Sequence, residues 1–198
     1  YGDQFERKVG HMLPIPEERI LIRREQETVD LGGGRTLTFY DTPGHARHHF
    51  SAFDSGSGGI FCGDVLGIRY VRQFSGIEPE LVFPISSPPE FDDAATLDSV
   101  RKLESLKPVK VFHTHFGVTE PASFAIERIR KSVEVYRNIA RDCSRLPDRI
   151  NAMKEKLTAF FLDEYAKHGV DPVDLSPFVS DLEMSAAGLD VYLKKHAP

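Results

Sequence analysis

Three short apolar runs in the first 118 residues each end beside a glycine and a histidine or an aspartate. They are "RTLTFYDTPGH" (35–45), "GIFCGD" (59–64) and "VKVFHTHFG" (109–117). Short runs of alternating or continuous apolar residues that stop at turn residues are typical of β-strands. The chain is therefore predicted to contain strands whose ends present His45, Asp64 and His115.

The rest of this first part also reads mainly as strands. Residues 19–24, "RILIRR", follow two prolines and predict a strand, and the segments around Gly32–Gly34 predict a hairpin. Residues 72–92 carry four prolines and no clear period, so they predict a long loop of the kind that covers active sites. Apolar residues at helical spacing predict one helix over about 93–106.

The pattern changes near residue 120. Apolar residues then recur at spacings of three and four, which predicts one long amphipathic helix over 120–146 and a second from 150 to His168-Gly169, with shorter helices after it. We therefore predict an α/β protein in two parts, residues 1–118 and an all-helical extension over 119–198. The extension is expected to act as a cap or as a dimerisation element, because its apolar stripes are too long to stay exposed.

Composition excludes several classes of protein. The chain of 198 residues is 40% apolar and 28% charged, which is ordinary for a globular protein, and its net charge of −5 argues against a general nucleic-acid binder. No apolar run approaches the roughly 20 residues of a membrane span. The start of the chain has no apolar signal segment. Cys62 and Cys143 are far apart, which favours a reduced cytoplasmic protein over a disulfide scaffold.

His45 and Asp64 each have a functional and an ordinary reading. A turn through Thr42, Pro43 and Gly44 would project the His45 imidazole from the sheet edge, where it is suited to bind a metal, but one histidine after a turn is often a surface residue. Asp64 ends an apolar strand, where a carboxylate is costly to bury unless it meets a cation or caps a helix. Taken by itself, the position of Asp64 predicts a helix-capping or turn residue.

His113 and His115 share one face of the third predicted strand, because side chains alternate along a strand. Together they form either a His-x-His clamp on one metal ion or two residues with separate roles. In the second reading His113 is a hydrogen-bonded core histidine and His115 alone reaches the sheet edge.

Considered together, "DTPGHARHH", "GGIFCGDVLG" and "VKVFHTHFG", with a helix before the last, resemble the C-terminal half of the metallo-β-lactamase superfamily over roughly residues 17–118. The resemblance implies an αββα sandwich with two divalent metal ions at one edge, most often zinc and sometimes iron or manganese. It implies that His45 completes one metal site, that Asp64 bridges both metals and that His115 binds the second. It also implies hydrolysis by a metal-bound hydroxide, because metals lower the pKa of water.

One part of the family pattern is absent. The His-x-His-x-Asp-His motif, which supplies two ligands to each metal, does not occur in these 198 residues. Without it each metal has only two protein ligands, whereas a catalytic zinc normally has three. The chain also lacks an initiator Met and opens on a helix-like pattern. We therefore expect a missing N-terminal half of the same fold as partner, and we do not expect this chain alone to be an active hydrolase.

The neighbours of these residues are expected to play lesser roles. His49 is expected to orient ligands or to pack, and His48 to point away. Arg69 and Tyr70 follow the Asp64 loop and either line the substrate site or lie in an exposed loop. Four arginines form a basic stripe on the helix over 120–146, which is usually a solvated face and in a minority reading attracts an anionic substrate: Arg130, Arg137, Arg141 and Arg145.

Three hypotheses for function remain open. The first is a metal-dependent hydrolase acting on a small-molecule ester, thioester or lactone. The second is a mononuclear iron sulfur dioxygenase on the same fold. The third is an inactive fragment that docks to a partner half, with a homodimer through the helices as a further alternative. Neither a nucleic acid nor a membrane is expected as a partner, and the acidic balance disfavours a nuclease.

Overall fold

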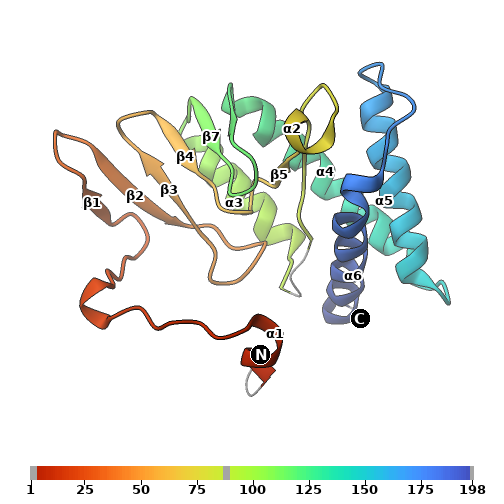
Figure 1. Cartoon of the computed structure of the whole chain (residues 1–198), viewed down its shortest axis with the longest axis horizontal. Coiled ribbons are helices and arrows are strands. Elements are labelled where there is room, and N and C mark those ends of the chain that lie inside the picture. Colours follow the sequence, from red (N-terminus) through yellow and green to blue (C-terminus); the bar gives the residue numbers. More distant parts are fainter. Residues whose placement is uncertain (1–3, 87–89, 197–198) are drawn as a thin grey trace.

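A six-stranded sheet with helices packed on one of its faces forms the body of the molecule (Figure 1). The structure is a computed structural model that describes residues 4–86 and 90–196. The strands are β1 (Thr28–Asp30), β2 (Thr36–Asp41), β3 (Phe50–Asp54), β4 (Gly59–Phe61), β5 (Ile68–Arg69), β6 (Val82–Phe83), β7 (Lys110–Phe112) and β8 (Val118–Thr119). The helices are α1 (Phe5–Val9), α2 (Arg72–Ser75), α3 (Asp93–Ser105), α4 (Ala122–Cys143), α5 (Arg149–Ala166) and α6 (Val179–His196), with 3-10 turns η2 (Glu17–Arg19) and η3 (Ser176–Phe178).

Strands β2, β4 and β7 run in the same direction, and this brings their ends together. The strand order is β1-β2-β3-β4-β7-β8. The β2–β3 and β3–β4 pairs are antiparallel, whereas β4 and β7 pair in parallel. The chain between β4 and β7 passes through a small two-stranded sheet of β5 and β6 and through α3, because parallel neighbours need a long crossover. The C-terminal ends of β2, β4 and β7 consequently lie along one edge of the sheet.

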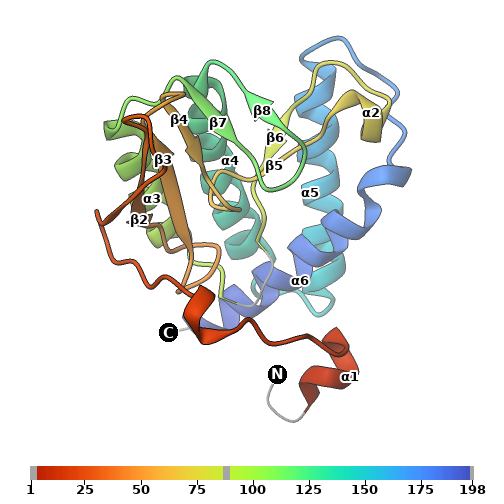
Figure 2. The ribbon, with the colours of Figure 1, turned by 60° about the vertical axis from the view of Figure 1, so that its left-hand side comes forward.

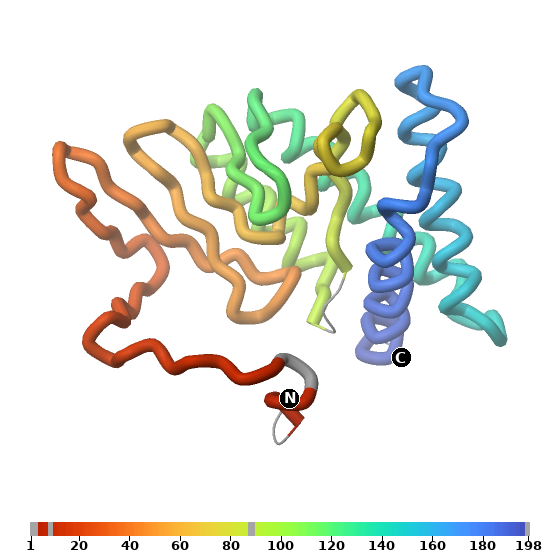
Figure 3. Tube along the Cα trace, viewed as in Figure 1, coloured from red at the N-terminus to blue at the C-terminus, as the bar shows by residue number. Residues whose placement is uncertain are grey.

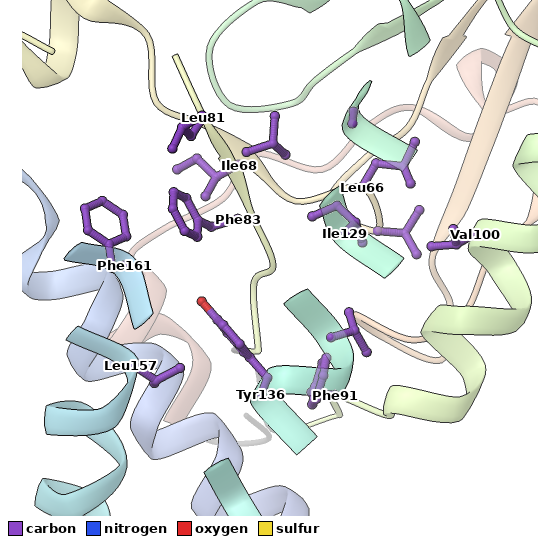
Figure 4. Packing of buried hydrophobic residues seen from close by; sticks show 14 of the residues in the cluster. Leu66, Ile68, Leu81, Phe83, Phe91, Val100, Ile129, Tyr136, Leu157 and Phe161 are labelled. Carbon is purple, nitrogen blue, oxygen red and sulfur yellow. The ribbon is translucent and has the colours of Figure 1, made fainter. Parts of the chain in front are cut away.

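The hydrophobic core lies between the sheet and α3 and α4, which cover the same face (Figure 2). Ile60 of β4 and Val111 of β7 are register partners, and both are fully buried. On the helix side, Ile129 of α4 lies beside Leu66 and near Val100 of α3 (Figure 4). Apolar residues on one stripe of each helix thus meet the inward positions of the strands, as the sequence pattern predicts.

Helices α5 and α6 extend the same core. Both pack on α4 and on each other, and Leu157 of α5 and Leu189 of α6 are fully buried. The core therefore contains residues from both sides of residue 118. The division into residues 1–118 and 119–198 as separate units stays a prediction.

The face of the sheet opposite the helices carries aromatic side chains, and we call it the open face. Phe39, Ala52, Phe61 and Phe112 are successive register partners across β2, β3, β4 and β7. The rings of Phe61 and Phe112 stack with their centroids 4.6 Å apart. Phe61 is 44% exposed and Phe50, two residues from Ala52, is 57% exposed. The rings of Phe50 and Phe61 therefore face solvent in the part of the chain that the structure describes.

The strand predicted over residues 19–24 is wrong. The segment before β1 forms an arm that leaves the sheet and passes below it in the view of Figure 3. Within this arm only the short η2 turn and α1 are regular, and Ile20, Leu21 and Ile22 are 51%, 66% and 80% exposed. An extended segment becomes a strand only when a neighbour completes its hydrogen bonds, and no described strand lies next to this one. The predicted hairpin around Gly32–Gly34 is confirmed as β1 and β2.

Residues 72–92 are a long connection, as predicted, that also holds α2 and β6; its residues 87–89 lie outside the described ranges. Cys62 and Cys143 are both free and buried. No helix in the described ranges has the length and apolar character needed to cross a membrane.

A fully buried carboxylate anchors the β2–β3 hairpin. Arg35 donates from Nε and Nη2 to the two oxygens of Asp54, each at 2.7 Å, and Ser57 Oγ donates to Oδ2 at 2.6 Å. The Arg35 guanidinium, followed by Ser57, holds the pKa of Asp54 well below its usual range. A carboxyl group with a lowered pKa stabilises the fold above its unfolded pKa of about 4, and this stabilisation is lost as the pH falls through that region toward the folded pKa.

We predict that Asp54→Asn lowers the urea midpoint of unfolding at pH 7, because Arg35 loses its charged partner. The difference from wild type should shrink at pH 3, where unfolded wild-type protein binds the proton that the folded state excludes. Urea titrations followed by circular dichroism at the two pH values would measure both effects. An equal difference at pH 7 and pH 3 would contradict the assignment of this carboxylate as the anchor.

We predict that Ile129→Ala costs about 2–5 kcal/mol in the free energy of unfolding, because it removes buried methyl groups from the centre of the core. The matched control is Leu13→Ala in the arm, where the side chain is 81% exposed. That change should stay within about 0.5 kcal/mol of wild type. Urea unfolding of both variants tests whether the sheet and helices share one core, and equal costs would refute it.

Candidate metal centre

His45, Asp64 and His115 follow three strands that run in the same direction, and the structure brings them together. His45 follows β2, Asp64 follows β4 and His115 follows β7. His45 Nε2 lies 3.3 Å from Asp64 Oδ2, and His115 Nε2 lies 3.4 Å from Asp64 Oδ1. The carboxylate therefore stands between two imidazoles and presents one oxygen to each. The sequence places these residues at strand ends, and the register places those ends side by side.

The turn that carries His45 is fixed against the start of α3. Gly44 has a φ of +139°, and a Cβ atom there would lie 2.6 Å from the Cα of Thr96. The Asp92 N–H donates to the Gly44 carbonyl at 2.8 Å, and Ser99 Oγ donates to the Pro43 carbonyl at 2.6 Å. Only glycine permits this close approach. The Pro43-Gly44 turn thus determines where the His45 imidazole points.

His49 holds the backbone at Asp64. Its Nε2 accepts a hydrogen bond from the Asp64 N–H at 2.9 Å, so the proton of the neutral ring is on Nδ1, which donates to Thr42 Oγ1 at 2.9 Å. Thr42 Oγ1 lies 2.8 Å from Ser51 Oγ, which in turn donates to the Cys62 carbonyl at 3.3 Å. This chain of hydrogen bonds ties the end of β2 to the end of β4. Gly63 makes room for it, because a Cβ atom there would clash with the His49 ring.

The partly buried imidazoles of His45 and His49 favour the neutral form. Burial lowers the pKa of His45, although the nearby charge of Asp64 opposes this effect. Burial, followed by the proximity of His45, also lowers the pKa of His49. A neutral imidazole has a free lone pair, which is the form that binds a metal.

His113 is a core residue with both ring nitrogens engaged. Its Nδ1 donates to the Gly67 carbonyl at 3.2 Å, and its Nε2 accepts from Thr119 Oγ1 at 2.9 Å. Burial lowers its pKa to about 4. His113 therefore has no free nitrogen for a metal ion, and the His113–His115 clamp is not formed in this structure.

The donor set fits one side of a two-metal site. His45 Nδ1 and Asp64 Oδ1 are buried and have no hydrogen-bond partner among the described residues. Two imidazoles and a carboxylate are suitable ligands for zinc or iron. Within the described ranges, however, no three His, Cys, Asp or Glu side chains surround one point closely enough to hold an ion by themselves. Further ligands are needed to complete either metal position.

A cavity of about 620 Å³ opens next to these three residues. Besides His45, Asp64 and His115, its wall contains mainly aromatic and aliphatic side chains from β5, β6, α2 and the helices α4, α5 and α6. A second hollow of about 390 Å³ reaches His45, His49 and Asp64 from the open face, beside Phe50 and Phe61. The candidate metal centre thus has space on both sides.

Tyr70 and Arg69 face different surroundings. Tyr70 lines the 620 Å³ cavity, whereas Arg69 lies outside it and pairs with Glu80. His48 is 89% exposed, lies 3.9 Å from Glu90 and borders the 390 Å³ hollow, so its predicted orientation away from the centre stays a prediction. In the basic stripe of α4, Arg130 pairs with Glu104 and Arg137 with Asp93. None of the four stripe arginines lines the cavity.

Some cavity residues were not predicted from the sequence. Tyr136, Phe161 and Asp181 come from α4, α5 and α6, all beyond residue 118. Asp181 belongs to the "SDLE" segment, whose only sequence signal is that of a helix start. Nothing in a helical pattern indicates which residue will face a cavity formed with a distant strand.

This chain is similar in sequence and in fold to known proteins. The model of the metallo-beta-lactamase superfamily matches residues 2–115. The curated metallo-beta-lactamase fold-containing protein ST1585 of Sulfurisphaera tokodaii is 32% identical over 120 residues, which cover 61% of this chain and 41% of that protein.

Solved structures show the same fold. The crystal structure of ST1585 from Sulfolobus tokodaii matches with a TM-score of 0.55 and 21% identity, over 96% of this chain and 59% of that chain. The metallo-beta-lactamase family protein TTHA1429 from Thermus thermophilus matches with a TM-score of 0.55 and 16% identity, over 89% and 49%. The chain thus spans less than two thirds of the length of each of these relatives.

We predict that His49→Phe speeds hydrogen exchange at the Asp64 amide, because the amide loses its acceptor while the ring volume is retained. Amide exchange followed by NMR at neutral pH measures this directly, without a metal. His48→Phe is the matched control and should leave the exchange rate unchanged, since that side chain is exposed. An Asp64 amide that is equally protected in both variants would contradict the role assigned to His49.

Proposed function

The chain belongs to the metallo-beta-lactamase superfamily, and we propose that it forms one side of a two-metal centre that hydrolyses an ester, thioester or lactone. The observation that carries the proposal is the placement of Asp64 between two imidazoles, with Oδ2 3.3 Å from His45 Nε2 and Oδ1 3.4 Å from His115 Nε2. A carboxylate that presents one oxygen to each of two histidines is suited to bridge two metal ions.

Each residue of the centre has a distinct role in this proposal. His45 and Asp64 would hold one metal ion, and Asp64 and His115 the other, with zinc favoured by the imidazole and carboxylate donors. When bound, two divalent ions supply a water of lowered pKa and polarise the substrate carbonyl. His49 keeps Asp64 in place through its backbone N–H. The cavity beside the centre binds the acyl part of the substrate and excludes water from it.

We propose that the remaining ligands come from a protein segment outside these 198 residues, in the same polypeptide or in a partner. Three observations support this. The described residues provide only part of a metal site. The hollow on the open face reaches His45 and Asp64 directly. The open face itself exposes Phe50 and Phe61, which a second layer would cover at a gain of roughly 25 cal/mol for each Å² of apolar surface buried.

The proposal predicts that Asp64→Ala reduces metal content and abolishes hydrolysis, because both metal ions share this carboxylate. Elemental mass spectrometry on protein purified without chelator, in the presence of the completing segment, should find about two metal ions per wild-type chain. The Asp64→Ala protein should lose at least one of them, and turnover of an aryl ester, a thioester or a lactone should fall by a factor of about 10³ or more, as expected when a central group is removed.

Asp98→Ala is the matched control, since Asp98 lies on the outer side of α3 and its side chain is 70% exposed. It should retain full metal content and activity. Full hydrolysis in the Asp64→Ala protein would overturn the two-metal mechanism. Iron in place of zinc, with oxygen consumption on a thiol substrate, would instead favour the dioxygenase.

A further inference from the structure

Tyr70 and Asp181 form a polar pair in the wall of the 620 Å³ cavity. The Tyr70 hydroxyl donates to Asp181 Oδ2 at 2.7 Å, although the two residues are 111 positions apart in the sequence. Tyr70 is only 3% exposed, and Asp181 lies in the first turn of α6. Among the hydrogen bonds of the described residues, the other carboxylate oxygen, Oδ1, has no protein partner.

An aromatic path connects this pair with the metal side of the cavity. Phe116 follows His115, its ring stacks on Phe74 at 4.9 Å, and Phe74 in turn stacks on Tyr70 at 6.2 Å. All of these side chains line the cavity. A ligand that reaches from His115 to Asp181 would therefore pass over apolar rings before it meets a carboxylate.

The charge of the cavity wall is one-sided. Apart from the candidate metal ligands, Asp181 is the one charged side chain among the described residues that line the cavity, and none of them is a lysine or an arginine. Burial, followed by the charge of Asp181, raises the pKa values of both Tyr70 and Tyr136 far above neutral, so these phenols stay protonated and uncharged. A carboxylate in an apolar wall favours a cation and repels an anion.

Asp181 also has an ordinary structural role, because an acidic side chain in the first turn stabilises a helix. A carboxylate can fulfil that role while it is exposed to solvent. It does not need to contact a buried tyrosine such as Tyr70, which lies between β5 and β6. The rings of Tyr70, Phe74 and Tyr136 surround the same space, and aromatic faces together with a carboxylate are suited to bind ammonium groups.

We propose that this cavity selects substrates that carry an ammonium group on an apolar or aromatic body, and that Asp181 pairs with this group. The inference rests on the proposed function for the identity of the reaction, because it assigns the part of the substrate remote from the bond that is cleaved. The proposal also predicts that the cavity binds substrates with acidic acyl groups weakly. This prediction is opposite to the hypothesis that the stripe of arginines attracts an anionic substrate.

Binding of small probes tests the selectivity without any turnover. The probes are 4-phenylbutylammonium, 4-phenylbutanol and 4-phenylbutyrate, titrated by ligand-observed NMR into the 198-residue chain at pH 7 with EDTA present. The ammonium should bind at least about tenfold more tightly than the carboxylate, with the alcohol between them. In Asp181→Asn this preference should fall to within about twofold.

Two further variants separate the cavity from general charge effects. Glu183→Gln removes the same charge two residues along α6, at a side chain that is 53% exposed and outside the cavity, and should keep the preference. Met184→Lys places a cation on the cavity wall at a position that is 50% exposed, and should reverse the preference even if Asp181→Asn does not fold.

The inference is overturned if the carboxylate binds as tightly as the ammonium in wild type, or if the preference survives in Asp181→Asn or Met184→Lys. These results would leave the metal centre untouched, since no metal is present in the titration. Conversely, a protein that fails to hydrolyse any ester but binds the ammonium selectively would refute the proposed function and keep Asp181 as a recognition residue.

Discussion

The parallel pairing of β4 with β7 is the constraint on which the candidate centre depends. Because β4 and β7 run in the same direction, and β2 runs with them through two antiparallel steps, the residues that follow all three strands lie at one edge of the sheet. Asp64 and His115 come directly from the parallel pair. A shift of one residue in this register would move Ile60 and Val111 out of the core, so the packing of the helices and the position of the ligands are fixed by the same interaction.

The partly buried carboxylate of Asp64 needs groups that compensate its charge, and the described residues provide some of them. The Asp64 backbone is held by His49, and its two oxygens each face an imidazole. Burial lowers the pKa of His45, which favours the neutral ring and leaves the charge of Asp64 without compensation from this imidazole. A pair of divalent cations would balance it. The same edge opens toward the exposed rings of Phe50 and Phe61, so the incomplete donor set and the uncovered sheet face occur together.

The helices beyond residue 118 take part in both the core and the cavity. Ile129 and Leu157 are buried in the same core as the strands. Tyr136, Phe161 and Asp181 line the cavity that reaches Asp64. In the function proposed above, residues on these helices would contact the substrate, whereas His45, Asp64 and His115 at the strand ends would bind the metal ions.

The sequence by itself determined the strand ends and the amphipathic helices, because turn residues and hydrophobic periodicity are local properties. It indicated His45, Asp64 and His115 as a group only through the resemblance of three motifs to a known family. It did not determine that His113 uses both ring nitrogens in the core, or that residues 19–24 remain an exposed arm, since each depends on which distant groups complete the hydrogen bonds. The contact of Tyr70 with Asp181 was decided only by the tertiary structure, because it requires α6 to pack beside a small sheet more than a hundred residues away in sequence. Local patterns determine which face of a helix or strand is apolar, whereas long-range packing decides which distant group each polar side chain contacts.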